Sequence, residues 1–308
     1  MKNKEPLVSI IIPTRNRPEG LQQCLAAIAG LDYPRDKFEV IVVDDGSSTQ
    51  LYSVVELFSE KINLFLLKQD HAGPAAARNR GVQQAKGKFL VFTDDDCRPT
   101  PGWLAALTDF LSRKPNFMVG GEILNGLPQN LFSSASQTLV SYLYSYYNKN
   151  SGGAHFFTAN NIALSKKCFL AVGGFDHKWG IAAAEDREFC DRWLLNGYKM
   201  TYAPEAVIYH THSMSLTGFW DQHFNYGRGA HFFHRARNRH NQDPMKIEPL
   251  SFYLNLLRFP FLRFKKLKAA SISGLIVLAQ AANVLGFFWE QFSQKPSKNK
   301  LTRNVSAS

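Results

Sequence analysis

The sequence has few cysteines, and they are scattered. The four cysteines among 308 residues are Cys24, Cys97, Cys168 and Cys190, and no two form a CxxC pair. Structural zinc sites and the disulfide frameworks of small secreted domains need closely paired cysteines, so the sequence indicates neither. Isolated cysteines in a chain of enzyme size are typical of a reducing, intracellular compartment.

An apolar leader is also lacking. The chain opens with MKNKEPLVSI, and its first apolar run stops at Pro13. A secretory signal peptide needs a longer apolar core than this. We therefore expect the body of the protein to stay in the cytoplasm.

Acidic residues are scarce in the C-terminal part. Residues 1–225 hold 22 Lys/Arg and 22 Asp/Glu, whereas residues 226–308 hold 14 and 3. The whole net charge of +11 therefore lies in the C-terminal part. A basic tail favours an anionic partner, either phospholipid head groups or nucleic acid.

Residues 269–289 carry no charge and directly follow a basic cluster of Arg263, Lys265, Lys266 and Lys268. The uncharged stretch is long enough to cross a bilayer. Ser271, Ser273, Gln280 and Asn283 dilute it, which leaves two forms open, a single span and an interfacial or docked helix. Both forms place the protein at the cytoplasmic face of a membrane. No nucleic-acid-reading motif accompanies the basic residues, so we expect an anionic membrane surface and no nucleic acid.

Short apolar runs alternate with helical patterns along the first 120 residues. The runs are rich in Val, Ile, Leu and Phe and lie at 7–13, 38–45, 62–68, 88–96 and 117–121. They are continuous rather than alternating, as in strands covered on both faces. Helices are predicted between them, at 18–29 and 103–113 among others. This order predicts an α/β fold with a mostly parallel, Rossmann-like sheet flanked by helices.

Polar clusters follow three of the predicted strands. They are Pro13-Thr14-Arg15-Asn16, Asp44-Asp45-Gly46-Ser47 and Asp94-Asp95-Asp96. Each cluster by itself is also an ordinary set of turn and N-cap residues. Parallel strands, however, bring their carboxyl ends to one edge, where open α/β sheets bind ligands.

Five carboxylates at one edge repel each other unless a cation offsets them. Oxygen ligands favour Mg²⁺ or Mn²⁺ over zinc, and these ions usually accompany a diphosphate. The edge therefore predicts a divalent metal and a nucleoside-diphosphate site.

Four segments carry a resemblance to a known family. They are VSIIIPTRNR, VIVVDDGS, GPAAARNRG and FLVFTDDDC, in that order. From Val8 to about Arg235 the chain resembles the family 2 glycosyltransferases, which have the GT-A fold. The resemblance implies a nucleoside-diphosphate-sugar donor, a divalent metal at an Asp-x-Asp motif and inversion at the anomeric carbon.

The resemblance also implies roles for single residues. The donor is expected at Pro13, Thr14, Asp45, Arg78 and Asp94, and the metal at Asp96. Asp95, between the two motif carboxylates, is expected to face away from the site. The alternative explanation for Arg78 is a surface arginine on a helix.

A further carboxylate pair stands in GGFDHKWGIAAAEDREFCDRWLLNGYK, residues 173–199. A helix beginning near Glu185 places Asp186, Phe189, Cys190 and Trp193 on one face. Asp186 is therefore aimed inward, whereas Arg187, Glu188, Asp191 and Arg192 are expected in solvent. An acidic residue in a first helical turn also has a purely structural explanation, the helix dipole. The resemblance makes Asp186 the catalytic base and places acceptor contacts at Trp179, Gly180 and Glu185.

Two histidines follow the predicted strand that ends in VIY. The resemblance implies a metal ligand at His210, with His212 as the alternative. Both can serve, since residues i and i+2 of a strand share a face, and a histidine hydrogen-bonded in a loop is the structural alternative. FTANNIALS, residues 157–165, resembles the family strand beneath the donor sugar, although Asn160 and Asn161 are also turn formers.

The sequence departs from the processive members of the family, which carry a Gln-x-x-Arg-Trp motif. QHFNYGRG, residues 222–229, has no Arg-Trp pair, so transfer of a single sugar is expected. Gln222 and Tyr226, one helical turn apart, are candidates for acceptor contacts.

These expectations divide the chain into three parts. Residues 1–122 form the nucleotide-sugar-binding half, residues 123–240 the acceptor-binding and catalytic half, and residues 241–308 a basic, apolar, membrane-associating tail. The predicted activity is an inverting, metal-dependent transfer of one sugar to a hydroxyl acceptor, a lipid-linked or cell-surface glycan precursor. The alternative is a GT-A-like protein that binds nucleotide sugar without turnover.

Overall fold

The computed structural model describes residues 7–148, 153–178, 183–239 and 248–293. The strands are β1 Val8–Thr14, β2 Phe38–Asp45, β3 Leu64–Gln69, β4 Phe89–Thr93, β5 Cys97–Pro99, β6 Phe117–Asn125, β7 Asn161–Ser165 and β8 Lys199–His210. The α-helices are α1 Pro18–Ala29, α2 Tyr52–Glu56, α3 Pro74–Gln84, α4 Trp103–Arg113, α5 Leu131–Tyr147, α6 Lys166–Val172, α7 Glu185–Leu195, α8 Leu216–Arg239, α9 Leu250–Arg258 and α10 Lys266–Ser293. Two short 3₁₀ helices are η1 Arg35–Lys37 and η2 Phe259–Leu262.

All strands join one eight-stranded sheet in the order β3-β2-β1-β4-β7-β6-β8-β5. The pairs among β3, β2, β1 and β4 are parallel, as is β6 with β8. The pairs β4–β7, β7–β6 and β8–β5 are antiparallel. The predicted fold class is confirmed, with a sheet that is parallel in its N-terminal part and mixed beyond β4.

The N-terminal elements follow the sequence pattern closely. Every residue of β1, β2 and β4 is buried, as expected of continuous apolar runs covered on both faces. Helix α1 begins at Pro18, whose fixed φ suits a first helical position. The predicted strand 88–96 ends earlier, at Thr93, so the three aspartates lie in the turn between β4 and the short strand β5.

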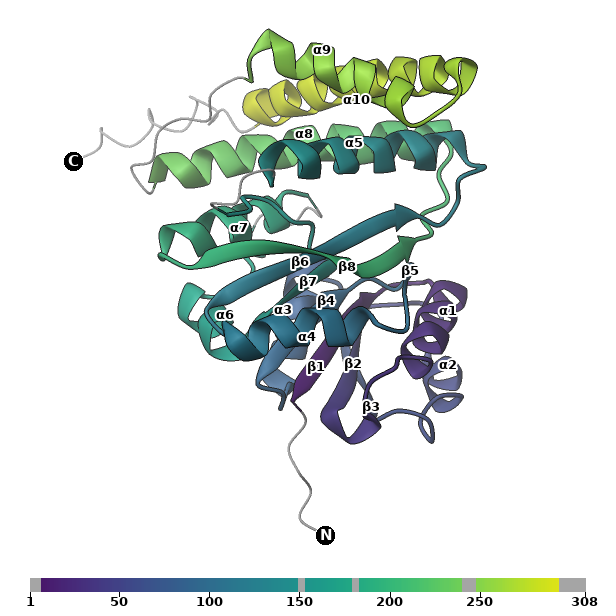
Figure 1. Cartoon of the computed structure of the whole chain (residues 1–308), viewed down its shortest axis with the longest axis vertical. Helices are drawn as coiled ribbons and strands as arrows, with labels where there is room; N and C mark the ends of the chain where they lie inside the picture. The colour runs from purple at the N-terminus through teal and green to yellow at the C-terminus, as the bar shows by residue number, and fades with distance from the viewer. Residues whose placement is uncertain (1–6, 149–152, 179–182, 240–247, 294–308) are drawn as a thin grey trace, which may run out of the picture.

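The C-terminal helices form a separate layer. In Figure 1, α5 and α8 cover the sheet, and α9 and α10 lie over them at the end of the molecule farthest from the N-terminus. A second apolar core joins α5, α8, α9 and α10, and Ala135, Phe219, Leu256 and Ile276 are among its buried residues. Helix α10 has 28 residues and a mean hydropathy of 1.7 in its most apolar window, long and apolar enough to cross a membrane.

Candidate active site

A cavity of about 530 Å³ opens at the carboxyl ends of β1, β2 and β4. Its walls also include α5, the start of α7, the end of β8 and α8. Nine residues predicted from the sequence line it: Pro13, Thr14, Asp45, Arg78, Asp94, Asp96, Glu185, Asp186 and His210. Trp179 and Gly180 lie outside the described residues. The fold thus brings the predicted donor, metal and base positions into one site.

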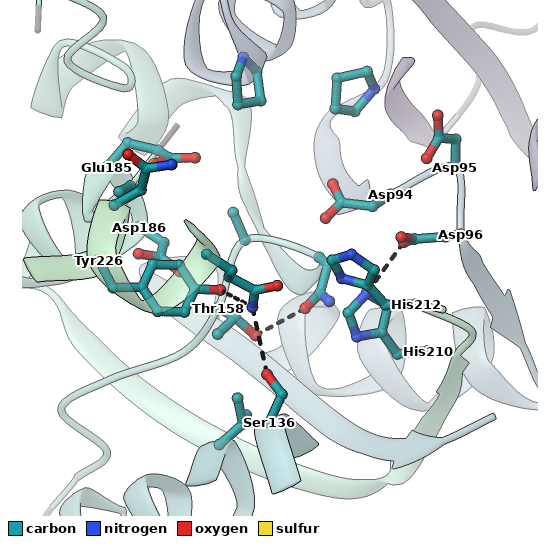
Figure 2. A pocket seen from close by; sticks show the side chains of 18 of the residues that line it. Asp94, Asp95, Asp96, Ser136, Thr158, Glu185, Asp186, His210, His212 and Tyr226 are labelled. Atoms are coloured by element: carbon teal, nitrogen blue, oxygen red, sulfur yellow. Dashed lines mark hydrogen bonds and ion pairs between the residues drawn. The ribbon is translucent and has the colours of Figure 1, made fainter. Parts of the chain in front are cut away.

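The three aspartates between β4 and β5 point in different directions (Figure 2). The Thr14 hydroxyl donates to Asp95 Oδ2 at 2.7 Å, which holds this side chain toward β1. Arg17 Nη1, at the start of α1, donates to Asp95 Oδ1 at 3.2 Å and to Asp96 Oδ2 at 2.9 Å. Burial raises the pKa of Asp95 to about 6, against the lowering effect of Arg17. Asp95 borders the cavity together with Asp94 and Asp96, contrary to the expectation that it faces away from the site, but Thr14 and Arg17 hold its carboxylate.

Asp96, His210 and His212 form a candidate metal centre. One ligand atom from each lies within 4.8 Å of the others. Their proximity follows from strand pairing, because β5 runs antiparallel to β8 and the Thr211 backbone N–H donates to Asp96 O at 2.8 Å. Both histidines that the sequence left as alternatives belong to the group.

The ion pair in this group has consequences for protonation. His210 Nε2 lies 3.2 Å from Asp96 Oδ1. Burial disfavours both charges, but this contact raises the pKa of His210 and holds the pKa of Asp96 well below its usual range. Burial lowers the pKa of His212, which keeps that ring in the neutral form that binds metals. One carboxylate and two imidazoles suit a divalent transition-metal ion such as Mn²⁺ better than Mg²⁺, which prefers oxygen ligands.

Arg78 lies between the two carboxylate groups of the site. Its Nη2 donates to Asp94 Oδ1 at 2.7 Å, and its Nη1 donates to Glu185 Oε1 at 3.2 Å. Its side chain is only 5% exposed, so the alternative of a surface arginine is wrong. One buried cation thereby joins the turn after β4 to the start of α7.

Asp186 is the second residue of α7, which begins where Ala184 adopts a left-handed φ of 68°. The Arg187 backbone N–H donates to Asp186 Oδ1 at 2.7 Å. Although Asp186 borders the cavity, the protein around it removes much of its hydration, and together with the charge of Glu185 this raises its pKa to about 7. Figure 2 shows Asp186 on the opposite side of the cavity from Asp96 and His210. A carboxylate with this pKa can take up a proton near neutral pH.

The apolar stripe of α7 agrees with the sequence, but its polar face is less exposed than predicted: the side chains of Asp191 and Arg192 are 24% and 18% exposed, and Arg187 is half-buried. Phe189, Cys190 and Trp193 are buried, as predicted. Glu188, expected in solvent, is only 6% exposed. Arg192 explains the difference, because its Nε and Nη2 each donate to Glu188 at 2.6 Å and form a bidentate pair.

Asp45 at the end of β2 organises the loop that leads into α3. Its carboxylate accepts from Gln69 Nε2 at 2.7 Å, from the Ala72 backbone at 2.8 Å and from the Gly73 backbone at 2.9 Å. His71 Nδ1 lies 2.8 Å from the same carboxylate. Burial works against ionisation, but these hydrogen bonds lower the pKa of Asp45.

The two asparagines before β7 have different environments. Asn160 borders the cavity. Asn161 is fully buried and accepts from Trp103 Nε1 at 2.8 Å, so its contacts are structural. Its Nδ2 donates to Glu122 O and Ala206 O, which holds β6 and β8 together.

The acceptor candidates on α8 connect two helices above the cavity. Gln222 Nε2 donates to the Tyr226 hydroxyl at 2.8 Å and to Ser136 Oγ on α5 at 3.4 Å. Sequence analysis did not select Ser136, or Gln137 beside it, because neither lies next to a motif. Arg17 was also missed, although its place just after a predicted strand end was a usable signal.

Comparison with protein families gives one match that covers just over half of the chain. The model described as glycosyl transferase family 2 matches residues 9–172. The glycosyltransferase AglE of Haloferax volcanii is 29% identical over 212 residues, which cover 68% of this chain and 68% of that protein. The poly(ribitol-phosphate) beta-N-acetylglucosaminyltransferase TarS of Staphylococcus aureus strain MW2 is 39% identical over 208 residues, which cover 66% of this chain but 35% of TarS. The chain therefore spans between about a third and two thirds of these relatives.

Solved structures share the fold. A mannosyltransferase, PcManGT from Pyrobaculum calidifontis in complex with GDP-Man and Mn²⁺, matches with a TM-score of 0.65 and 20% identity over 95% of this chain and 89% of that chain. TarS 1–349 in complex with UDP-GlcNAc matches with a TM-score of 0.53 and 20% identity over 93% of this chain and 90% of that chain. At this level of identity the likeness establishes the architecture.

Proposed function

Because the chain belongs to glycosyl transferase family 2, we propose that it transfers a single sugar from a nucleoside-diphosphate sugar to a hydroxyl acceptor, with inversion at the anomeric carbon. One observation carries this proposal. Asp186, a carboxylate with a pKa raised to about 7, lies across a single cavity from the Asp96, His210 and His212 group. A base and a cation site on opposite sides of a cavity suit in-line displacement of a diphosphate.

The proposed donor site lies in the N-terminal half, residues 1–122. We assign the nucleotide sugar to Pro13, Thr14, Asp45, Arg78 and Asp94, all of which border the cavity. The likeness to proteins solved with GDP-Man and UDP-GlcNAc supports a donor of this chemical class. The carboxylate of Asp45 already accepts hydrogen bonds from the loop before α3. Its proposed contact with the nucleotide base therefore requires one of these hydrogen bonds to break.

The proposed acceptor and base belong to residues 123–240. Glu185 borders the cavity beside Asp186, and the assignment extends to Trp179 and Gly180 by family resemblance alone. The missing Arg-Trp pair supports transfer of one sugar rather than polymerisation. Relatives that act on poly(ribitol-phosphate) support a cell-surface or lipid-linked glycan precursor as the acceptor class. We propose that residues 241–308, with α9 and α10, associate with the cytoplasmic face of a membrane.

The residues present fit a divalent metal. Asp96, His210 and His212 would hold it, and the Mn²⁺ in the mannosyltransferase neighbour supports Mn²⁺ or a related ion. When bound, such an ion offsets the negative charge that develops on the departing diphosphate. The guanidinium of Arg17 is a second positive charge beside Asp96, and it is supplied by the protein.

The reaction follows from the placement of Asp186. One of its carboxylate oxygens accepts the proton of the acceptor hydroxyl, and the hydroxyl oxygen bonds to the anomeric carbon. The bond between that carbon and the diphosphate oxygen breaks, and its electron pair leaves with the nucleoside diphosphate. Attack and departure on opposite faces invert the configuration. A positioned base of this kind contributes about 10² to 10⁴ in rate.

Hydrolysis of UDP-, GDP- and dTDP-sugars, each with Mn²⁺ or with EDTA, tests the proposal without knowledge of the acceptor. We expect Mn²⁺-dependent release of nucleoside diphosphate from one donor, and a loss of about 10² to 10⁴ in Asp186→Asn. Donor binding, measured by calorimetry, should be retained in that variant. Asp109→Asn, at an exposed position of α4, serves as the matched control.

A donor that binds to the wild-type protein but is never turned over, alone or with glycan acceptors, would favour the binding-only alternative. Turnover that is equal in EDTA would refute the metal assignment.

A further inference from the structure

Helix α10 has one buried face. Ala269, Ile272, Ile276, Ala279, Ala282, Gly286 and Glu290 are buried along it at intervals of three or four residues. This spacing forms a single stripe on an α-helix. The stripe packs on α8 and α5, two helices that belong to the folded body of the protein.

The contact between α8 and α10 is close and partly polar. A Cβ atom added at Gly227 would meet the Asn283 backbone, and one added at Gly286 would meet the Phe224 backbone, so the two helices touch at reciprocal glycines. Near the end of α10, Arg228 Nε lies 2.8 Å from Glu290 Oε2, and Glu290 is only 6% exposed. A helix that crosses a bilayer in isolation through residues 269–289 would have to break this buried ion pair and give up its packing on α8 and α5, which is costly.

The outer face of the same helices is strongly apolar. Of the 20 large hydrophobic residues that are exposed in the described chain, 11 lie on α9, η2 and α10: Leu250, Leu254, Phe261, Leu262, Leu267, Val277, Val284, Leu285, Phe288, Trp289 and Phe292. A soluble surface rarely gathers so many apolar side chains in one region. We call this set the apolar face.

Cations accompany the apolar face. Arg258, Lys265 and Lys266 are exposed around the junction between α9 and α10. Between residues 248 and 293 the acidic residues are Glu248, which accepts from the Tyr146 and Tyr147 hydroxyls, and the buried Glu290. Within the described residues no carboxylate forms an ion pair with these three cations, and exposed apolar residues beside such cations are complementary to an anionic lipid surface. A second copy of this chain would bring like charges together.

We propose that α9, η2 and α10 form a monotopic membrane-binding face, with α10 lying in the plane of an anionic bilayer surface instead of crossing it. Its apolar face enters the boundary between head groups and acyl chains, and Arg258, Lys265 and Lys266 contact anionic head groups. The sequence by itself left the spanning and interfacial forms open, and the packing of α10 on α8 favours the interfacial one.

This orientation deepens the proposed function, on which its catalytic meaning rests. In Figure 1, α9 and α10 lie on one side of α5 and α8, and the sheet lies on the other. Gln137 of α5 and Tyr226 of α8 border the active-site cavity on the sheet side. The layer of α9 and α10 and the layer of α5 and α8, each about 10 Å thick, therefore separate the apolar face from the cavity. A glycan acceptor held in the bilayer by a lipid anchor would have to extend across about 20 Å to reach the cavity.

Spin-label depth measurements distinguish the two forms of α10. The four native cysteines are free and buried, so a label should react selectively with Leu267→Cys, Val277→Cys or Leu285→Cys, positions that are 87%, 54% and 52% exposed. The measurement uses the full chain on phosphatidylcholine vesicles with and without phosphatidylglycerol. An in-plane helix predicts similar shallow depths of about 5–10 Å for all three labels. A spanning helix predicts a label at position 277 about 15 Å deeper than one at 267, which would overturn the proposal.

Vesicle sedimentation tests the chemistry of the face. We expect Leu285→Glu to weaken binding about tenfold or more, because it places a charge in the inserted surface. Lys266→Gln should weaken binding about fivefold, only on vesicles with phosphatidylglycerol. Leu57→Glu is the matched control, since Leu57 is 58% exposed on the distant helix α2.

Donor hydrolysis without vesicles should be unchanged in Leu285→Glu, so loss of membrane binding is distinguishable from failure of the proposed catalysis. Equal vesicle binding of Leu285→Glu and wild type would refute the proposed membrane-binding face. A stable dimer that covers the labelled positions and excludes vesicles would also refute it.

Discussion

Asp186 is subject to two opposing influences. Desolvation and the neighbouring Glu185 favour its protonated form, while the Arg187 backbone N–H, Arg78 and Arg187 favour the carboxylate. The result is a pKa of about 7, which suits the proposed role of Asp186 as a base. A carboxylate with an ordinary pKa near 4 would be ionised but a weaker base.

The pH dependence of donor turnover follows from this pKa. Because only the ionised carboxylate accepts a proton, we expect the rate at saturating donor and Mn²⁺ to be constant above about pH 7 and to fall about tenfold per unit below it. In Glu185→Gln the midpoint should move to lower pH, since the charge of Glu185 raises the pKa of Asp186. The measurement is the rate of nucleoside-diphosphate release as a function of pH. If the rate of Asp186→Asn falls below pH 7 in the same way as that of the wild type, a group other than Asp186 is titrating.

Among the elements, α8 and α10 depend on glycine for their approach. Gly227 and Gly286 allow the two backbones to come together, and the Arg228–Glu290 pair closes the same contact. Gly274, by contrast, lies on the same helix α10 with open space where its Cβ would be. The two kinds of glycine should respond in opposite ways to the same substitution.

We expect Gly227→Ala to lower the free energy of unfolding by about 1–3 kcal/mol, because the added methyl group meets the Asn283 backbone, which cannot rotate away. Gly274→Ala should raise it by about 0.5–1 kcal/mol, because alanine is the better helix former and nothing opposes it. Chemical denaturation followed by circular dichroism measures both. Stabilisation by Gly227→Ala would mean that α10 does not pack on α8 as described.

At the scale of the whole molecule, Arg78 connects the two halves of the chain. Its guanidinium binds Asp94 after β4 and Glu185 at the start of α7. The proposed donor and acceptor sites therefore share one buried cation. A change in one half can reach the other through it.

Loss of this cation should affect stability and the site together. Arg78→Met leaves two carboxylates without their partner and should lower the free energy of unfolding by about 3 kcal/mol, toward the lower end for a buried pair because Asp94 is 29% exposed. Arg78→Lys should recover part of the lost free energy of unfolding, because it keeps the positive charge. The recovery should be incomplete, because an ammonium group cannot bridge both carboxylates as a planar guanidinium does. Arg80→Met, at an exposed position of the same helix, is the control. Denaturant unfolding and calorimetry of donor binding are the measurements, and equal stability of the two methionine variants would contradict this role.

Local patterns in the sequence predict most of the elements and the chemistry at strand ends. Continuous apolar runs predicted β1, β2 and β4, and the limits of α1 and α4 agree with those predicted, because burial on both faces and helix termini leave signals within a few residues. The same signals located Asp45, Asp94 and Asp96, the family resemblance pointed to His210, and the spacing along α7 aimed Asp186 inward.

Which distant residues meet depends on the tertiary structure. The antiparallel pairing of β5 with β8 places His210 and His212 beside Asp96, and the packing of α5 brings Ser136 and Gln137 to the cavity. The burial of Arg78 and the docking of α10 on α8 depend on contacts between segments far apart in the chain. Such contacts are set by the topology and packing of the whole fold, so no local pattern of residues encodes them.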